Sequence, residues 1–154
     1  MQKLKSALQL TLSDWRYLMI ASVELFAARL RLAAVATHKI LQELQAPLSI
    51  LSQEKKSPLA KVDVQRLSWA IALAAQHVPW RSDCLIQAIA ADRWLRRHQL
   101  RPDFYLGVAK DEHDALASHA WLRYGDLIVT GGRSAQFSIL MDPGSDRDRS
   151  CGAE

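Results

Sequence analysis

The stretch that decides the fold is Val78-Pro79-Trp80-Arg81-Ser82-Asp83-Cys84-Leu85-Ile86-Gln87-Ala88, which joins two helical patterns. Pro79 ends the first pattern, because proline has no backbone N–H to donate within a helix. Ser82 is predicted to cap the next helix, which runs to about Arg97 and carries Cys84 in its first turn.

The predicted place of Cys84 puts a thiol among unpaired backbone N–H groups, at the positive end of a helix dipole. Such a position favours the thiolate, which is the nucleophilic form, although the adjacent carboxylate of Asp83 acts against it. With a histidine brought up from elsewhere, this is the arrangement of a cysteine nucleophile. The alternative is a cysteine that serves only as a small apolar side chain of the core.

Composition predicts a single domain with its own core, since the chain has 154 residues, of which 49% are apolar and 23% are charged. Two cysteines make no disulfide framework and favour a reducing compartment. The net charge of +4 comes from scattered Lys and Arg largely matched by acids, so nucleic-acid binding is not favoured.

The N-terminus lacks the pattern of a signal peptide. The most apolar run, residues 17–28, is interrupted by Glu24 and is shorter than the roughly 20 residues of a membrane-spanning helix. We therefore expect a cytoplasmic protein without a transmembrane segment. No cofactor is expected, because no phosphate-binding glycine loop is present, and His38, His77, His98 and His113 lack the spacing of metal ligands.

Helical periodicity comes first along the chain. Residues 7–45 are predicted to form one long helix or two in succession, with a helix-start signal at Ser13 and Asp14. Residues 63–77 are predicted to form the helix before the cysteine. The first of these regions is apolar on two faces, and one face would pack against the core. The other face would also pack in the core, or would bind a partner protein or a membrane surface.

The period then changes from 3.6 to 2. Strands are predicted over 103–109, over 119–124 and 127–130 as a hairpin around Gly125-Asp126, and over 136–141. Helices followed by antiparallel strands define an α+β fold.

Three segments are expected: a helical segment 1–57 that docks a partner, a catalytic core 58–141, and a disordered tail 142–154. The polar connector from Pro47 to Pro58 supplies the boundary between the first two.

His119 follows Cys84 at the start of a predicted strand, as in papain-like and transglutaminase-like enzymes. The blocks Cys84-Leu-Ile-Gln-Ala-Ile-Ala-Ala-Asp-Arg-Trp-Leu-Arg-Arg, Phe104-Tyr-Leu-Gly-Val-Ala-Lys110 and His119-Ala-Trp-Leu-Arg-Tyr-Gly-Asp-Leu-Ile-Val-Thr-Gly-Gly132 resemble those of the lasso-peptide leader peptidases. These are the transglutaminase-like B proteins of lasso-peptide biosynthesis, and the resemblance covers roughly residues 76–140.

The resemblance implies the protease half of a B protein that is split into two separate polypeptides. Such a protease removes the leader of a ribosomally made precursor peptide, helped by a separate leader-recognition protein. A separate ATP-dependent cyclase then closes the macrolactam ring. The implied fold is a cysteine-bearing helix packed on a small antiparallel sheet.

The resemblance makes Cys84 the nucleophile and His119 the base, with the backbone N–H of Cys84 stabilising the oxyanion. Asp126 is the nearest acid on the strand that returns opposite His119, and it is our candidate for the third member of a triad. Its place in the turn puts it roughly 20 Å from His119. The alternatives to Asp126 as the group that orients His119 are an acid of the 110–118 loop (Asp111, Glu112, Asp114) and a backbone carbonyl.

Two other functions remain open. A transglutaminase-like acyltransferase or amidase would use the same two residues on another substrate. A non-catalytic interaction module would keep only the fold, and the lack of a carboxylate opposite His119 favours it.

Overall fold

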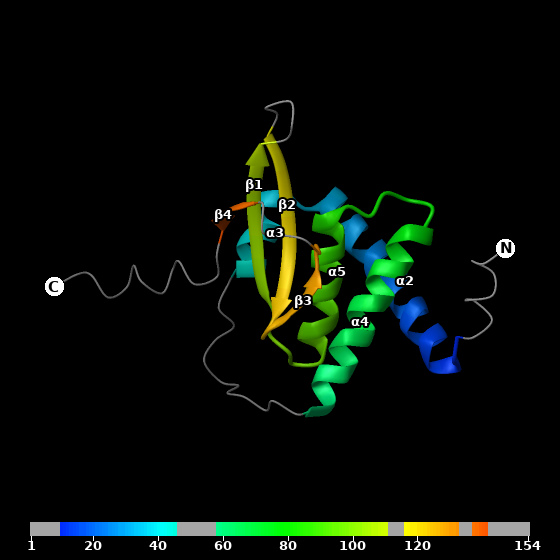
Figure 1. The fold of residues 1–154 in the computed structure, drawn as a ribbon. Helices are drawn as coiled ribbons and strands as arrows, with labels where there is room; N and C mark the ends of the chain where they lie inside the picture. The colour runs from blue at the N-terminus through cyan, green and yellow to red at the C-terminus, as the bar shows by residue number, and fades with distance from the viewer. Residues whose placement is uncertain (1–9, 46–57, 111–115, 133–136, 142–154) are drawn as a thin grey trace.

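The computed structural model describes residues 10–45, 58–110, 116–132 and 137–141. They form helices α2 (Leu12–Ala34), α3 (Thr37–Gln45), α4 (Pro58–His77) and α5 (Cys84–Arg97), followed by strands β1 (Asp103–Lys110), β2 (Leu116–Tyr124), β3 (Leu127–Thr130) and β4 (Ser138–Met141). Figure 1 shows the helices gathered beside the sheet. The predicted α+β class is confirmed.

The four strands make one antiparallel sheet in the order β3-β2-β1-β4. The hairpin between β2 and β3 turns at Gly125 and Asp126, as the sequence predicts. β4 returns to pair with β1 at the other edge, opposite Leu106, Gly107 and Val108.

The first predicted helical region is two helices, and its start differs from the prediction. Thr11, not Ser13, caps α2, because its hydroxyl accepts from the N–H of Asp14 while the Asp14 carboxylate accepts from the Thr11 N–H. This reciprocal pair is a capping box, and it satisfies two N–H groups at the helix start. The Thr11 bonds also lower the pKa of Asp14.

The helix before the cysteine begins at Pro58, five residues earlier than predicted. Proline is suited to the first helical position, where its missing N–H costs nothing. The predicted connector therefore ends as α4 begins. Its residues 47–57 lie outside the described part, as does the predicted tail 142–154.

One hydrophobic core joins the elements. α2 contributes Ala21, Leu25 and Ala28 to the same cluster as Ile71 of α4 and Ile89 of α5. Phe104, Ala120, Leu122 and Val129 belong to the same cluster from the sheet. Within the described residues, no helix is long and apolar enough to cross a membrane.

Candidate functional site

Cys84 lies in the first turn of α5, as expected. It is the first helical residue because the cap is Asp83 and not Ser82. The Asp83 carboxylate accepts from the Ile86 N–H at 3.1 Å. Asp caps as well as Ser does, and its charge also complements the helix dipole. The Ser82 carbonyl instead accepts from the side-chain amide of Gln87 at 2.8 Å.

The thiol of Cys84 is free and half-buried, packed against the hydrophobic core. Two polar atoms just before it, the indole N–H of Trp80 and the hydroxyl of Ser82, are buried without a hydrogen-bond partner among the described residues. Buried polar atoms of this kind are uncommon in native structures and call for an explanation such as a catalytic role.

His119 lies on β2, directly opposite Gly107 of β1. Its Nε2 is 2.5 Å from the carbonyl oxygen of Gly131, just beyond the end of β3. Because a carbonyl oxygen only accepts, Nε2 must carry the proton. The neutral imidazole then has its lone pair on Nδ1, which is the nitrogen left to act as a base.

Aromatic rings enclose His119 on its own face of the sheet. The imidazole stacks on Phe137 (ring centroids 4.7 Å apart) and on Trp121 (6.0 Å), and Trp121 stacks on Tyr105. Gly107 makes room for them, since a Cβ there would lie 2.9 Å from the Trp121 ring and 3.0 Å from Phe137. The packing holds the imidazole plane in one orientation.

The structure places Cys84 and His119 on packed elements but does not join their side chains. α5 packs against β2, and it begins at the end of the domain where β2 also begins (Figure 1). Ala120 and Leu122 of β2 face the helices in the core, so the alternation along the strand puts His119 on the other face. Among the described residues, the thiol and the imidazole form no hydrogen bond with each other.

Asp126 is not brought to His119. Its side chain is 96% exposed in the β2–β3 turn and lies 3.8 Å from Arg123. The Gly131 carbonyl occupies the orienting position, which was one of the alternatives left by the sequence. Asp111, Glu112 and Asp114 lie outside the described residues.

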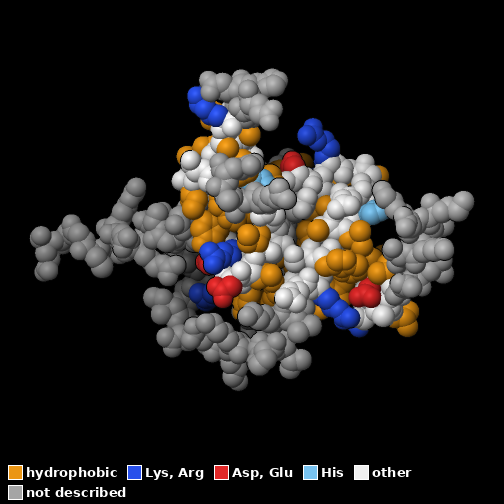
Figure 2. Space-filling view, viewed as in Figure 1, with side chains coloured by type: hydrophobic (Ala, Val, Ile, Leu, Met, Phe, Trp, Pro, Cys, Tyr) orange, Lys and Arg blue, Asp and Glu red, His pale blue; other side chains and the backbone are white. Residues whose placement is uncertain are grey.

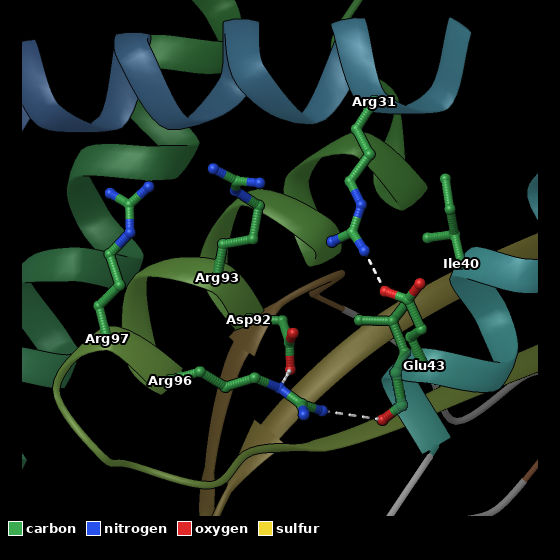
Figure 3. Close-up of a pocket in the computed structure, with 8 residues that line it drawn as sticks. Arg31, Ile40, Glu43, Asp92, Arg93, Arg96 and Arg97 are labelled. Atoms are coloured by element: carbon green, nitrogen blue, oxygen red, sulfur yellow. Dashed lines mark hydrogen bonds and ion pairs between the residues drawn. The ribbon is translucent and has the colours of Figure 1, made fainter. Parts of the chain in front are cut away.

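A second polar feature lies between α2, α3 and α5. A hollow of about 390 Å³ is lined there by four arginines, Arg31, Arg93, Arg96 and Arg97. Figure 3 shows how they lie. Each pairs with a carboxylate: Arg31 with Glu43, Arg96 with Asp92 at 2.7 Å, and both Arg93 and Arg97 with the buried Glu24. Because every guanidinium has an acidic partner, we interpret this cluster as a link between the three helices.

A family model described as the transglutaminase-like superfamily matches residues 22–142, from the middle of α2 to the residue after β4. No curated protein and no solved structure matches the chain.

Proposed function

Since this chain belongs to the transglutaminase-like superfamily, we propose that it is a cysteine endopeptidase that removes the leader from a lasso-peptide precursor. The superfamily generally has cysteine-protease or acyltransferase activity. The proposal takes the protease branch because the sequence blocks around Cys84 and His119 resemble those of the leader peptidases.

In the proposed reaction, Nδ1 of His119 takes the thiol proton and the Cys84 thiolate attacks the scissile carbonyl. The oxyanion meets backbone N–H groups at the start of α5, that of Cys84 included. The imidazolium gives its proton to the leaving amine, which departs from the acyl-enzyme. Water, deprotonated by His119, then releases the leader as a free carboxylate and restores the thiol.

One observation carries the proposal: a free thiol on the first residue of a helix that packs against the strand bearing an oriented histidine. The reaction requires the imidazole to meet the thiol, which its present contacts to Gly131 and the aromatic rings do not provide. Because the imidazole lies on the face of β2 away from the helices, the pair forms only if the start of β2 rearranges and turns His119 toward the thiol. The substrate-bound state is the one in which we expect this rearrangement.

The proposal includes partners. The substrate is the precursor peptide, recognised through its leader by a separate leader-recognition protein, and the ATP-dependent cyclase acts on the product. The leader-recognition protein and the cyclase are both proposed from the family resemblance.

Mass spectrometry of the precursor peptide, incubated with this protein and the leader-recognition protein, tests the proposal. Cleavage at one bond should be lost in both Cys84→Ala and His119→Ala, with circular dichroism unchanged. The matched control is Asp126→Asn, which should cleave normally because the side chain is exposed in a turn. Full cleavage by either active-site variant overturns the assignment.

The same spectra separate hydrolysis from acyl transfer. Hydrolysis gives two products whose masses sum to that of the substrate plus one water. Acyl transfer gives a product in which the accepting amine replaces the departing amine. Products of the second kind would reassign the protein to the acyltransferase branch while keeping Cys84 as nucleophile.

A further inference from the structure

The outer face of α2 carries an apolar ridge, which we define as Leu12, Trp15, Met19, Val23, Phe26 and Leu30. Every member is at least 46% exposed. Soluble proteins rarely leave so continuous an apolar surface open unless something binds to it. In Figure 2 hydrophobic side chains gather on the side of the molecule where Figure 1 shows α2.

The ridge is straight. Its six positions span 18 residues in five steps, a mean of 3.6 residues per step, which is the repeat of an α-helix. The side chains therefore stay on one face for about 27 Å, at 1.5 Å per residue. The opposite face of α2 is already used, because Ala21, Leu25 and Ala28 are fully buried.

The charges around the ridge are basic. Arg16 and Arg29 are exposed on the same helix. The two carboxylates of α2 are engaged: Asp14 in the capping box and Glu24 in its buried pairs with Arg93 and Arg97. A complementary surface would be apolar with acidic flanks.

We infer that the ridge docks an amphipathic helix of a partner protein, whose apolar stripe is flanked by Asp or Glu. A helix supplies anchors at spacings of three and four residues that match a straight ridge. This inference does not depend on the peptidase activity proposed above.

The basic flanks argue against a second copy of this chain as the occupant. A pair of α2 ridges would bring four guanidinium groups and no free carboxylate to the rim of the interface. It therefore lacks the charge complementarity that an acidic helix supplies.

A membrane surface fits less well than a protein. Helices that lie on membranes are rich in Lys and Arg on the polar face. The ridge has only Arg16 and Arg29 beside it.

The ridge also reaches the segment that leads into Cys84. Phe26 contacts Trp80, with ring centroids 5.3 Å apart, and Arg29 donates to the Arg81 carbonyl at 3.3 Å. A helix docked along α2 would therefore contact the chain three or four residues before the thiol.

Two labelled synthetic peptides test the inference by fluorescence anisotropy with the full-length protein. Both are 21-residue amphipathic helices with Leu at the helical repeat; one has Glu at the flanks and the other has Lys. The Glu peptide should bind at least ten-fold more tightly than the Lys peptide. Val23→Glu should weaken the binding of the Glu peptide at least ten-fold. Arg16→Glu should reduce or reverse the preference for the Glu peptide over the Lys peptide.

Ile128→Glu is the matched control, because Ile128 is also an exposed apolar residue but lies on β3. It should bind the Glu peptide as the unaltered protein does. The inference is overturned if neither peptide binds, if both bind equally, or if Val23→Glu has no effect. It is also overturned by tighter binding to phosphatidylserine vesicles than to the Glu peptide, or by a dimer in sedimentation that Val23→Glu abolishes.

Discussion

At the scale of single residues, the candidate site depends on a backbone atom. The carbonyl of Gly131 fixes the proton on Nε2 of His119, and no side chain in the described part shares that task. The sequence predicts the Gly131-Gly132 pair opposite His119, but it does not reveal which backbone oxygen turns toward the ring. A backbone carbonyl is present at every position, so residue types carry little information about this contact.

Gly131 has a φ of +93°, and a Cβ there would lie 2.4 Å from the Cβ of Trp121 and 2.8 Å from the Ala120 carbonyl. We expect Gly131→Ala to lose about 1–3 kcal/mol to backbone strain, with the steric overlap adding to that loss. Urea unfolding measures the change. The cleavage assay should show lower activity, because the carbonyl that orients His119 is displaced.

Gly132→Ala is the matched control. Gly132 also has positive φ, +55°, but nothing lies within 4 Å of a Cβ there. The expected loss is about 1 kcal/mol, from the left-handed conformation alone. Equal losses in the two variants would show that contact with Trp121 does not restrict this position.

At the scale of elements, periodicity and turn residues predicted most of the secondary structure. The hairpin at Gly125-Asp126 is confirmed, since strand patterns flank a turn residue with φ of +58°. The helix starts were less accurate at Thr11, Pro58 and Asp83, because several good caps lie close together and the sequence alone does not choose among them. The place of β4 beside β1 depends on tertiary contacts of Gly107, which local patterns do not encode.

The cluster between α2, α3 and α5 makes a prediction about pH. Burial raises the pKa of Asp92, against the opposing effect of its bond with Arg96. A carboxyl with a raised folded-state pKa holds its proton more tightly when folded. Its stabilising contribution is therefore present below the ordinary pKa of about 3.9 and is lost as pH rises through the raised value.

We therefore expect the unfolding free energy of the unaltered protein, minus that of Asp92→Asn, to fall as pH rises from 3 to 7. Urea unfolding across this range measures it. Asp126→Asn is the control, and its exposed side chain should give a small change. A difference that grows with pH would mean that Arg96 and Arg31 outweigh burial and hold the carboxyl ionised.

At the scale of the whole molecule, the helices before and after residue 57 share one core. The predicted segments 1–57 and 58–141 were separated by a polar connector, but a connector's composition does not reveal whether the helices on its two sides pack together. In the structure, Leu25 of α2 is fully buried in the same cluster as Ile89 and Leu95 of α5. The family match also begins within α2, at residue 22.

A truncated protein that starts at Pro58 is therefore expected not to fold on its own. Removing α2 would expose the α4 and α5 surfaces that pack against Ala21, Leu25 and Ala28. Full burial of one Leu side chain contributes about 1.5–3 kcal/mol, and a domain's net stability is only about 5–15 kcal/mol, so the loss of a whole helix face is comparable to that total. Thermal unfolding followed by circular dichroism, with a protein that starts at Leu10 as the control, measures this. A cooperative transition in the protein that starts at Pro58 would show instead that α2 is an appended segment, and the apolar ridge would then belong to a separable docking module.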